Sequence, residues 1–249
     1  MDDKPGKTKA VFSSAVFFLI SLLLYGLLEL LRTSIPAVQN IPLVSFAPGS
    51  AAVIMILFYK SRPAGAEVFS IPKAPVLIIA AFITPLIIGV ISFLTVEALE
   101  FRASIVQAPG YSLFSFVITF SLLSIGAVFE EFGWRGYLYP LLKKQMGMLK
   151  AAILTGFFWA LWHIAYYSLG TLFMINFVVF SISASIIIAV IMEKTGQSLL
   201  TPILFHISIN LGFLIFFSQN FHFYYIMFTQ ALIWLAAALL FVSAIHIRR

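Results

Sequence analysis

The chain has 249 residues, of which 62% are hydrophobic and 10% are charged, with a formal net charge of +6 and no cysteine. A soluble domain is about 45–50% apolar and about 25% charged, so this composition excludes an ordinary soluble domain and indicates that lipid is the solvent. The absence of cysteine excludes disulfides, thiolate metal sites and cysteine nucleophiles. The basic residues lie in short segments beside apolar runs, a placement that indicates membrane topology and argues against nucleic-acid binding.

Eight apolar stretches predict membrane-spanning helices, each of which needs about 20 apolar residues. They cover about residues 11–31, 42–59, 74–95, 111–131, 150–168, 172–192, 198–217 and 223–246. The first follows three lysines, as a signal peptide would, but its apolar run exceeds the usual about 7–15 residues, so we expect a retained helix. Short linkers then predict one transmembrane domain over residues 1–249, an all-α polytopic bundle of about eight helices.

The basic residues also predict an orientation. If the N-terminus is cytoplasmic, every Lys and Arg except Arg32 and Arg102 falls in an inner segment. This asymmetry satisfies the positive-inside rule with both termini in the cytoplasm. The mixed segment 132–149 is predicted to lie along the inner interface, with Trp134, Tyr137 and Tyr139 at headgroup depth.

Two acidic residues near helix ends have a simple explanation. Glu29 is three residues before Arg32, and Glu193 is next to Lys194. Interfacial ion pairs within each of these segments are therefore expected.

Glu130 and Glu131 are different, because they end the apolar run SFVITFSLLSIGAVFEE. Ionisable groups at membrane depth are costly and usually functional. Adjacent helical residues point about 100° apart, so the two carboxylates cannot face one point. Arg135 follows Glu131 by four residues, the spacing of an intrahelical ion pair. We therefore predict that Glu131 pairs with Arg135 and that Glu130 faces a cavity, provided that the nearby glycines do not break the helix.

Three further polar residues lie within apolar stretches. His163 occurs in GFFWALWHIAYY, and His206 and Asn210 occur in TPILFHISINLGF, so all three are predicted well inside helices. The i,i+4 spacing puts His206 and Asn210 on one face. One such residue alone is often only an interhelical hydrogen bond, so the hypothesis depends on the combination.

The combination suits peptide hydrolysis. A carboxylate beside a histidine can activate water, and a second histidine with an amide can donate hydrogen bonds to an oxyanion. Glu130, His163 and His206 are also residue types that bind Zn²⁺, although no HExxH motif indicates a zincin-type site. The cofactor is thus left open between activated water alone and Zn²⁺.

Three short motifs carry a family resemblance. Glu130–Arg135 reads EExxxR, Trp159–His163 is similar to FxxxH, and His206–Asn210 reads HxxxN. In this order, over about residues 111–217, they resemble the CPBP family, also called the Abi family. That family comprises type II CAAX prenyl endopeptidases and bacteriocin-processing or self-immunity proteins.

The resemblance implies an eight-helix membrane bundle and a set of site residues. The implied catalytic residues are Glu130, His163, His206 and Asn210. The first two would activate water and the last two would stabilise the oxyanion, with Glu131 and Arg135 in support. Trp159 stands where the family usually has Phe, which predicts altered packing beside His163.

We therefore expect an intramembrane endopeptidase in the plasma membrane of a prokaryote, open toward the inner leaflet. Its expected partners are the lipid bilayer and a membrane-embedded or lipidated peptide or protein, with no nucleic acid. A prenylated substrate is expected if the host prenylates proteins; otherwise a leader peptide, pheromone precursor or membrane-protein partner is expected. The alternative is a non-proteolytic immunity or scaffold protein of the same family. A proton-coupled transporter is disfavoured, because the chain shows no internal inverted repeat.

Overall fold

The computed structural model describes residues 7–59, 76–99, 112–217 and 223–246. Every regular element in these ranges is helical, which confirms the predicted all-α class. The α-helices are α1 (Lys7–Ser34), α2 (Ala47–Phe58), α3 (Val76–Ala98), α4 (Leu113–Gly133), α5 (Tyr139–Met146), α6 (Met148–Trp162), α7 (Thr171–Thr195), α8 (Leu200–Phe216) and α9 (Tyr224–His246). Several basic residues used for the topology prediction lie outside the described residues: Lys4, Lys60, Arg62, Lys73, Arg102, Arg248 and Arg249.

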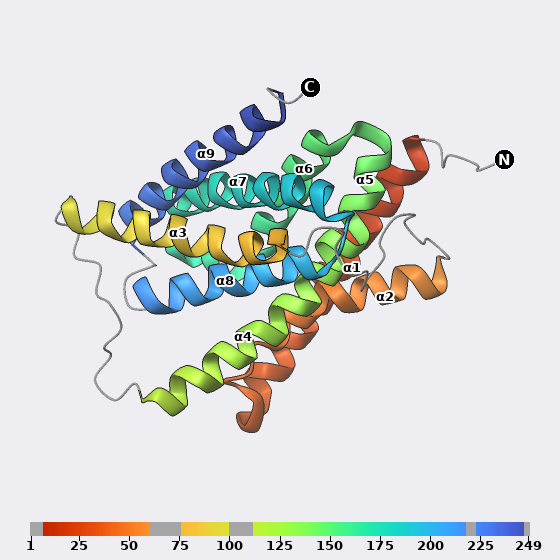
Figure 1. Ribbon diagram of the computed structural model, residues 1–249. Helices are drawn as coiled ribbons and strands as arrows, with labels where there is room; N and C mark the ends of the chain where they lie inside the picture. The colour runs from red at the N-terminus through yellow and green to blue at the C-terminus, as the bar shows by residue number, and fades with distance from the viewer. Residues whose placement is uncertain (1–6, 60–75, 100–111, 218–222, 247–249) are drawn as a thin grey trace.

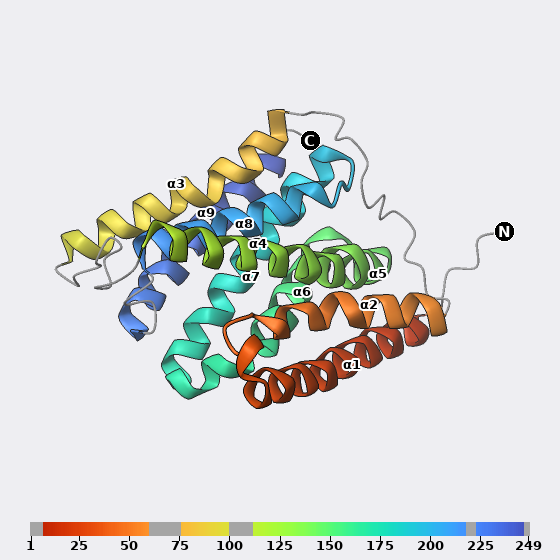
Figure 2. The ribbon, with the colours of Figure 1, turned by 90° about the horizontal axis from the view of Figure 1, so that it is seen from below.

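Helix α7 forms the centre of the bundle. It packs chiefly against α6 and α9, while α3 packs against α8 (Figure 1). Figure 2 shows α1 and α2 side by side along one edge of the molecule, with α4 next to α2. The three helices that carry the predicted site, α4, α6 and α8, therefore lie around the middle of the bundle.

Five segments are long and apolar enough to cross a membrane. They are Ala10–Ser34, Val76–Ala98, Leu113–Met146, Thr171–Thr195 and Tyr224–Ala244. The other three predicted stretches correspond to shorter apolar helices, Leu43–Phe58, Met148–Trp162 and Leu200–Phe216. Large apolar side chains such as Leu23, Val76 and Leu240 are exposed. A soluble protein rarely exposes so many such side chains, so the bundle is that of a multi-pass membrane protein.

A π-helical turn, Trp134–Leu138, joins α4 to α5 without a break. The glycines at 133 and 136 therefore do not end the helix. Trp134, Tyr137 and Tyr139, which were predicted at headgroup depth, are all buried inside the protein. Phe17 of α1 packs against Trp134 and Tyr137, with ring centroids 5.6 and 5.1 Å apart. The continuous helix turns these aromatic rings toward neighbouring helices.

The predicted span over residues 150–168 ends earlier than expected. Helix α6 stops at Trp162, His163 is its C-cap, and a 3₁₀ helix follows over Ile164–Leu169. His163 is thus at a helix end and not well inside a helix.

The two expected interfacial ion pairs have different outcomes. Glu29 and Arg32 do pair, with Nη2–Oε1 2.6 Å and Nε–Oε2 2.7 Å. Glu193, however, pairs with Lys143 of α5 rather than with Lys194. The hydroxyl of Tyr139 also donates to Glu193, at 3.4 Å. This glutamate therefore ties the end of α7 to α5, a contact between distant segments that local spacing does not reveal.

Candidate active site

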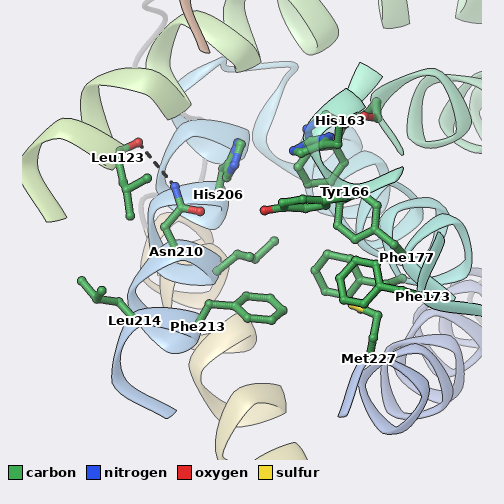
Figure 3. Close-up of a pocket in the computed structure, with 13 residues that line it drawn as sticks. Leu123, His163, Tyr166, Phe173, Phe177, His206, Asn210, Phe213, Leu214 and Met227 are labelled. Carbon is green, nitrogen blue, oxygen red and sulfur yellow. Dashed lines mark hydrogen bonds between the residues drawn. The ribbon is translucent and has the colours of Figure 1, made fainter. Parts of the chain in front are cut away.

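Four of the predicted site residues surround one cavity of about 250 Å³ (Figure 3). Trp159 and His163 reach it from the end of α6, and His206 and Asn210 reach it from one face of α8. The shared face of His206 and Asn210 is as the i,i+4 spacing predicts. The rest of the lining is mostly aromatic and aliphatic: Leu123, Tyr166, Phe173, Phe177, Phe180, Ile209, Phe213, Leu214 and Met227. A polar end thus adjoins a much larger apolar end.

Glu131 is fully buried and makes two side-chain contacts through one oxygen. Its Oε1 accepts a hydrogen bond from Arg135 Nη1 at 2.9 Å, which confirms the predicted ion pair. The same oxygen lies 2.8 Å from His206 Nδ1. The second contact joins residues 75 positions apart and was not predicted, because it depends on how α8 packs against α4.

Glu130 has a different environment, as the helical phase predicts. Its side chain is 5% exposed, and its Oε2 accepts a hydrogen bond from the indole Nε1 of Trp159 at 3.0 Å. The expectation that Glu130 itself faces the cavity is corrected, since Trp159 and not Glu130 belongs to the lining among the described residues. Glu130 interacts electrostatically with His163, so it remains close to the polar end of the cavity.

Both histidines are held through Nδ1. His163 Nδ1 lies 2.7 Å from the carbonyl oxygen of Trp159, and His206 Nδ1 contacts the Glu131 carboxylate. A carbonyl oxygen can only accept a hydrogen bond, so Nδ1 of His163 carries a hydrogen. A carboxylate oxygen also accepts, so Nδ1 of His206 carries a hydrogen as well. Nε2 of each ring is then the nitrogen left for a molecule in the cavity. An outer partner of this kind fixes both the tautomer and the ring orientation.

Asn210 is oriented by α4. Its Nδ2 donates to the carbonyl oxygen of Leu123 at 3.4 Å, and its amide oxygen points toward the cavity (Figure 3). The amide nitrogen has a second hydrogen that this bond does not use. The hydroxyl of Tyr166 points into the same space from the opposite wall (Figure 3). Tyr166 was not predicted from the sequence, although its position three residues after His163 was the available signal.

The suggested metal ligands do not form a metal-binding cluster. Within the described ranges, no group of three His, Cys, Asp or Glu side chains is arranged to hold a metal ion. Nδ1 of each histidine is engaged, which leaves Nε2 as its open nitrogen, and Glu130 Oε2 accepts a hydrogen bond from an indole. The described residues therefore show no preformed three-ligand zinc cluster.

Comparison with known proteins identifies the same part of the chain. The family model for type II CAAX prenyl endopeptidase Rce1-like proteins matches residues 110–212. CAAX prenyl protease 2 of Methanococcus maripaludis is 33% identical over 130 residues, which is 46% of this chain and 48% of that protein. Lysostaphin resistance protein A of Staphylococcus aureus is 29% identical over 213 residues, 82% of this chain and 50% of that protein.

The chain thus spans about half the length of the curated relatives it matches. The matched segment contains all of the candidate site residues from Glu130 to Asn210. Through residues 110–212, the chain is thus similar to the Rce1-like type II CAAX prenyl endopeptidases of the CPBP family.

Proposed function

We propose that the protein is an intramembrane endopeptidase that hydrolyses a peptide bond of a membrane-anchored or lipidated peptide. The observation that carries this proposal is the polar end of the cavity, where two histidines with fixed Nδ1 atoms and an asparagine lie beside two buried glutamates. The similarity of residues 110–212 to CAAX prenyl endopeptidases supports the reaction class. The whole bundle is proposed to cross the membrane eight times, with both termini in the cytoplasm of a prokaryote.

The proposed chemistry divides the polar residues into two pairs. Glu130, with His163 beside it, takes a proton from water as the water oxygen attacks the peptide carbonyl carbon. His206 donates to the oxygen that becomes negative when its ring carries a hydrogen on Nε2 as well as on Nδ1, and Asn210 donates through the Nδ2 hydrogen that the Leu123 bond leaves unused. The carbon–nitrogen bond then breaks, and the proton held by Glu130 passes to the leaving amine. Glu131 and Arg135 hold His206 in position without contacting the substrate.

The apolar end of the cavity supports a lipid-like or strongly apolar substrate group. Phe173, Phe177, Phe180 and Phe213 form much of its wall. Such a surface favours an apolar group next to the scissile bond, because its burial releases water from both partners. A farnesylated peptide is therefore the first substrate to test.

The test uses the purified protein in liposomes with two internally quenched peptides, one farnesylated at a cysteine near its C-terminus and one without the lipid. Glu130→Gln and His163→Ala are expected to abolish cleavage. Asn176→Ala is the control, because this residue of α7 donates to the Leu172 carbonyl of its own helix, at 2.8 Å, and is not among the residues that line the cavity. Cleavage at the parental rate by both site variants would refute the proposal.

A second candidate function is resistance without proteolysis. It is favoured by the similarity to lysostaphin resistance protein A over 82% of this chain. The chain and its Glu130→Gln variant can be expressed at equal levels in a lysostaphin-sensitive strain of Staphylococcus. Resistance that survives the substitution would favour a non-proteolytic role, and resistance that is lost with it would favour the peptidase.

A further inference from the structure

Trp159 contacts charged or ionisable side chains from three helical segments. Its indole Nε1 donates to Glu130 Oε2 at 3.0 Å, and its backbone carbonyl accepts from His163 Nδ1 at 2.7 Å. The guanidinium carbon of Arg135 lies 4.7 Å from the centroid of the indole ring. The ring of His206 approaches in a T-shaped arrangement, with centroids 5.2 Å apart.

We propose that Trp159 is a positioning residue of this site, which holds the Glu130 carboxylate through its indole N–H and supports Arg135 through its ring face. The inference rests on the proposed function, because it assumes that Glu130 is the base. It differs from the expectation drawn from sequence, in which an aromatic residue at this position only packs beside His163.

The hydrogen bond gives Trp159 a role that phenylalanine cannot supply. Phenylalanine has an aromatic face but no donor, whereas the indole N–H satisfies one oxygen of a carboxylate that is 5% exposed. A buried carboxylate without a donor loses much of its solvation and has no fixed orientation. Because Oε2 is held by Trp159, Oε1 is the Glu130 oxygen left to meet a water molecule.

The ring face serves the second glutamate indirectly. Arg135 is 2% exposed, and its Nη2 has no hydrogen-bond acceptor among the described residues. The guanidinium is therefore stabilised by Glu131 on one side and by the electron-rich indole face on another. Glu131 in turn orients His206. The Trp159 indole therefore contacts Glu130, the proposed base, and also Arg135, which supports the oxyanion donor His206 through Glu131.

The test separates the N–H from the ring. Trp159→Phe removes the donor and shortens the ring, and site-specific incorporation of benzothienylalanine at position 159 removes the donor but keeps the bicyclic shape. Trp234→Phe is the matched control, because this indole is also 2% exposed and also donates to a side chain, Gln230, at 3.2 Å. Cleavage of the farnesylated probe by each protein in liposomes gives kcat and KM, and thermal unfolding confirms that each is folded.

We expect both changes at position 159 to lower kcat by about ten- to a hundredfold, the range for losing a hydrogen bond to a charged group, with KM nearly unchanged. The control should keep the parental kcat. A parental kcat in either 159 variant would overturn the inference, because the indole N–H would then not be needed for the reaction. A rise in KM alone would also overturn it, because Trp159 would then only line the substrate cavity.

The Glu130→Gln variant distinguishes a failure of the proposed function from a failure of the role assigned to Trp159. If it is inactive while both 159 variants keep the parental kcat, the proposed function stands and the inference about Trp159 fails. If Glu130→Gln cleaves like the parent, or if the parent cleaves neither peptide, the proposed function fails and the inference falls with it.

Discussion

His206 Nδ1 lies 2.8 Å from Glu131 Oε1, the same oxygen that accepts a hydrogen bond from Arg135 at 2.9 Å. One buried oxygen therefore connects α8 to the end of α4. His206 belongs to the cavity wall, while Glu131 is fully buried. The carboxylate thus orients the imidazole from behind and leaves Nε2 for the cavity.

Removal of this carboxylate should destabilise the protein strongly. Glu131→Ala leaves the buried Arg135 without its carboxylate partner and His206 without an orienting group. Breaking a buried ion pair by removing one partner costs about 3–5 kcal/mol. We expect a large fall in the midpoint of thermal unfolding of the purified protein in detergent.

The exposed pair at the end of α1 provides the control for Glu131. Glu29 and Arg32 are each about one-third exposed, and exposed pairs contribute little to stability. Glu29→Ala should therefore leave the unfolding midpoint nearly unchanged. Equal midpoints for Glu131→Ala and the parent would contradict the importance given to the buried pair.

The close packing of α6 on α7 leads to a second stability prediction. A Cβ added at Gly156 would lie 2.7 Å from Ile182 Cα and 2.7 Å from the Ser181 carbonyl oxygen. These are backbone atoms that cannot turn aside, and small residues allow such close helix packing in membranes. Gly156→Ala should lower the free energy of unfolding by about 1–3 kcal/mol, as overpacked substitutions do. Since α6 also carries Trp159 and His163, kcat should fall too.

Gly26 in α1 is the matched control for this substitution. Among the described residues, no atom beyond the surrounding turns of its own helix lies within 4 Å of a Cβ added there, and alanine favours a helix over glycine by about 1 kcal/mol. Gly26→Ala should therefore unfold at the parental temperature or slightly above it. The packing argument is refuted if the two alanine variants unfold alike.

The sequence predicted those features that the geometry of a single helix determines. Apolar length identified the helices, and i,i+4 spacing identified the Glu131–Arg135 pair and the common face of His206 and Asn210. Each of these follows from the regular geometry of a single helix. The end of α6 was missed, because no glycine or proline marks the chain between Trp162 and His163.

Features that depend on contacts between helices were not predicted. The Trp159–Glu130 bond spans 29 residues and the His206–Glu131 bond spans 75. Their geometry is set by the relative rotation of packed helices, which hydrophobic patterns do not determine. For the same reason the burial of Trp134, Tyr137 and Tyr139 inside the protein was not predicted.

The arrangement of ligands predicts that activity does not require a metal. Among the residues that the structure describes, no three metal-ligating side chains are grouped, and Glu130 Oε2 accepts a hydrogen bond from the Trp159 indole. Prolonged treatment with a strong chelator should leave cleavage of the farnesylated probe unchanged. Elemental analysis of the active protein should find no stoichiometric transition metal. Loss of activity that added Zn²⁺ restores would contradict this prediction.

The final prediction concerns Tyr166, whose hydroxyl points into the space beside Asn210 (Figure 3). One N–H of Asn210 is directed to the Leu123 carbonyl, so a further donor at this position would strengthen binding of a developing oxyanion. Tyr166→Phe should lower kcat by about tenfold or more, since losing one such donor reduces rates by about 10²–10³ in well-formed sites.

The neighbouring Tyr167 is the control for Tyr166. Its hydroxyl donates to the Leu161 carbonyl at 3.2 Å, and its side chain is exposed outside the cavity lining. Tyr167→Phe removes the same chemical group from the adjacent position and should leave kcat unchanged. If Tyr166→Phe raises KM but keeps the parental kcat, the hydroxyl contacts the substrate in its ground state and does not stabilise the transition state. If Tyr166→Phe keeps the parental kcat and the parental KM, the hydroxyl of Tyr166 takes no part in the reaction.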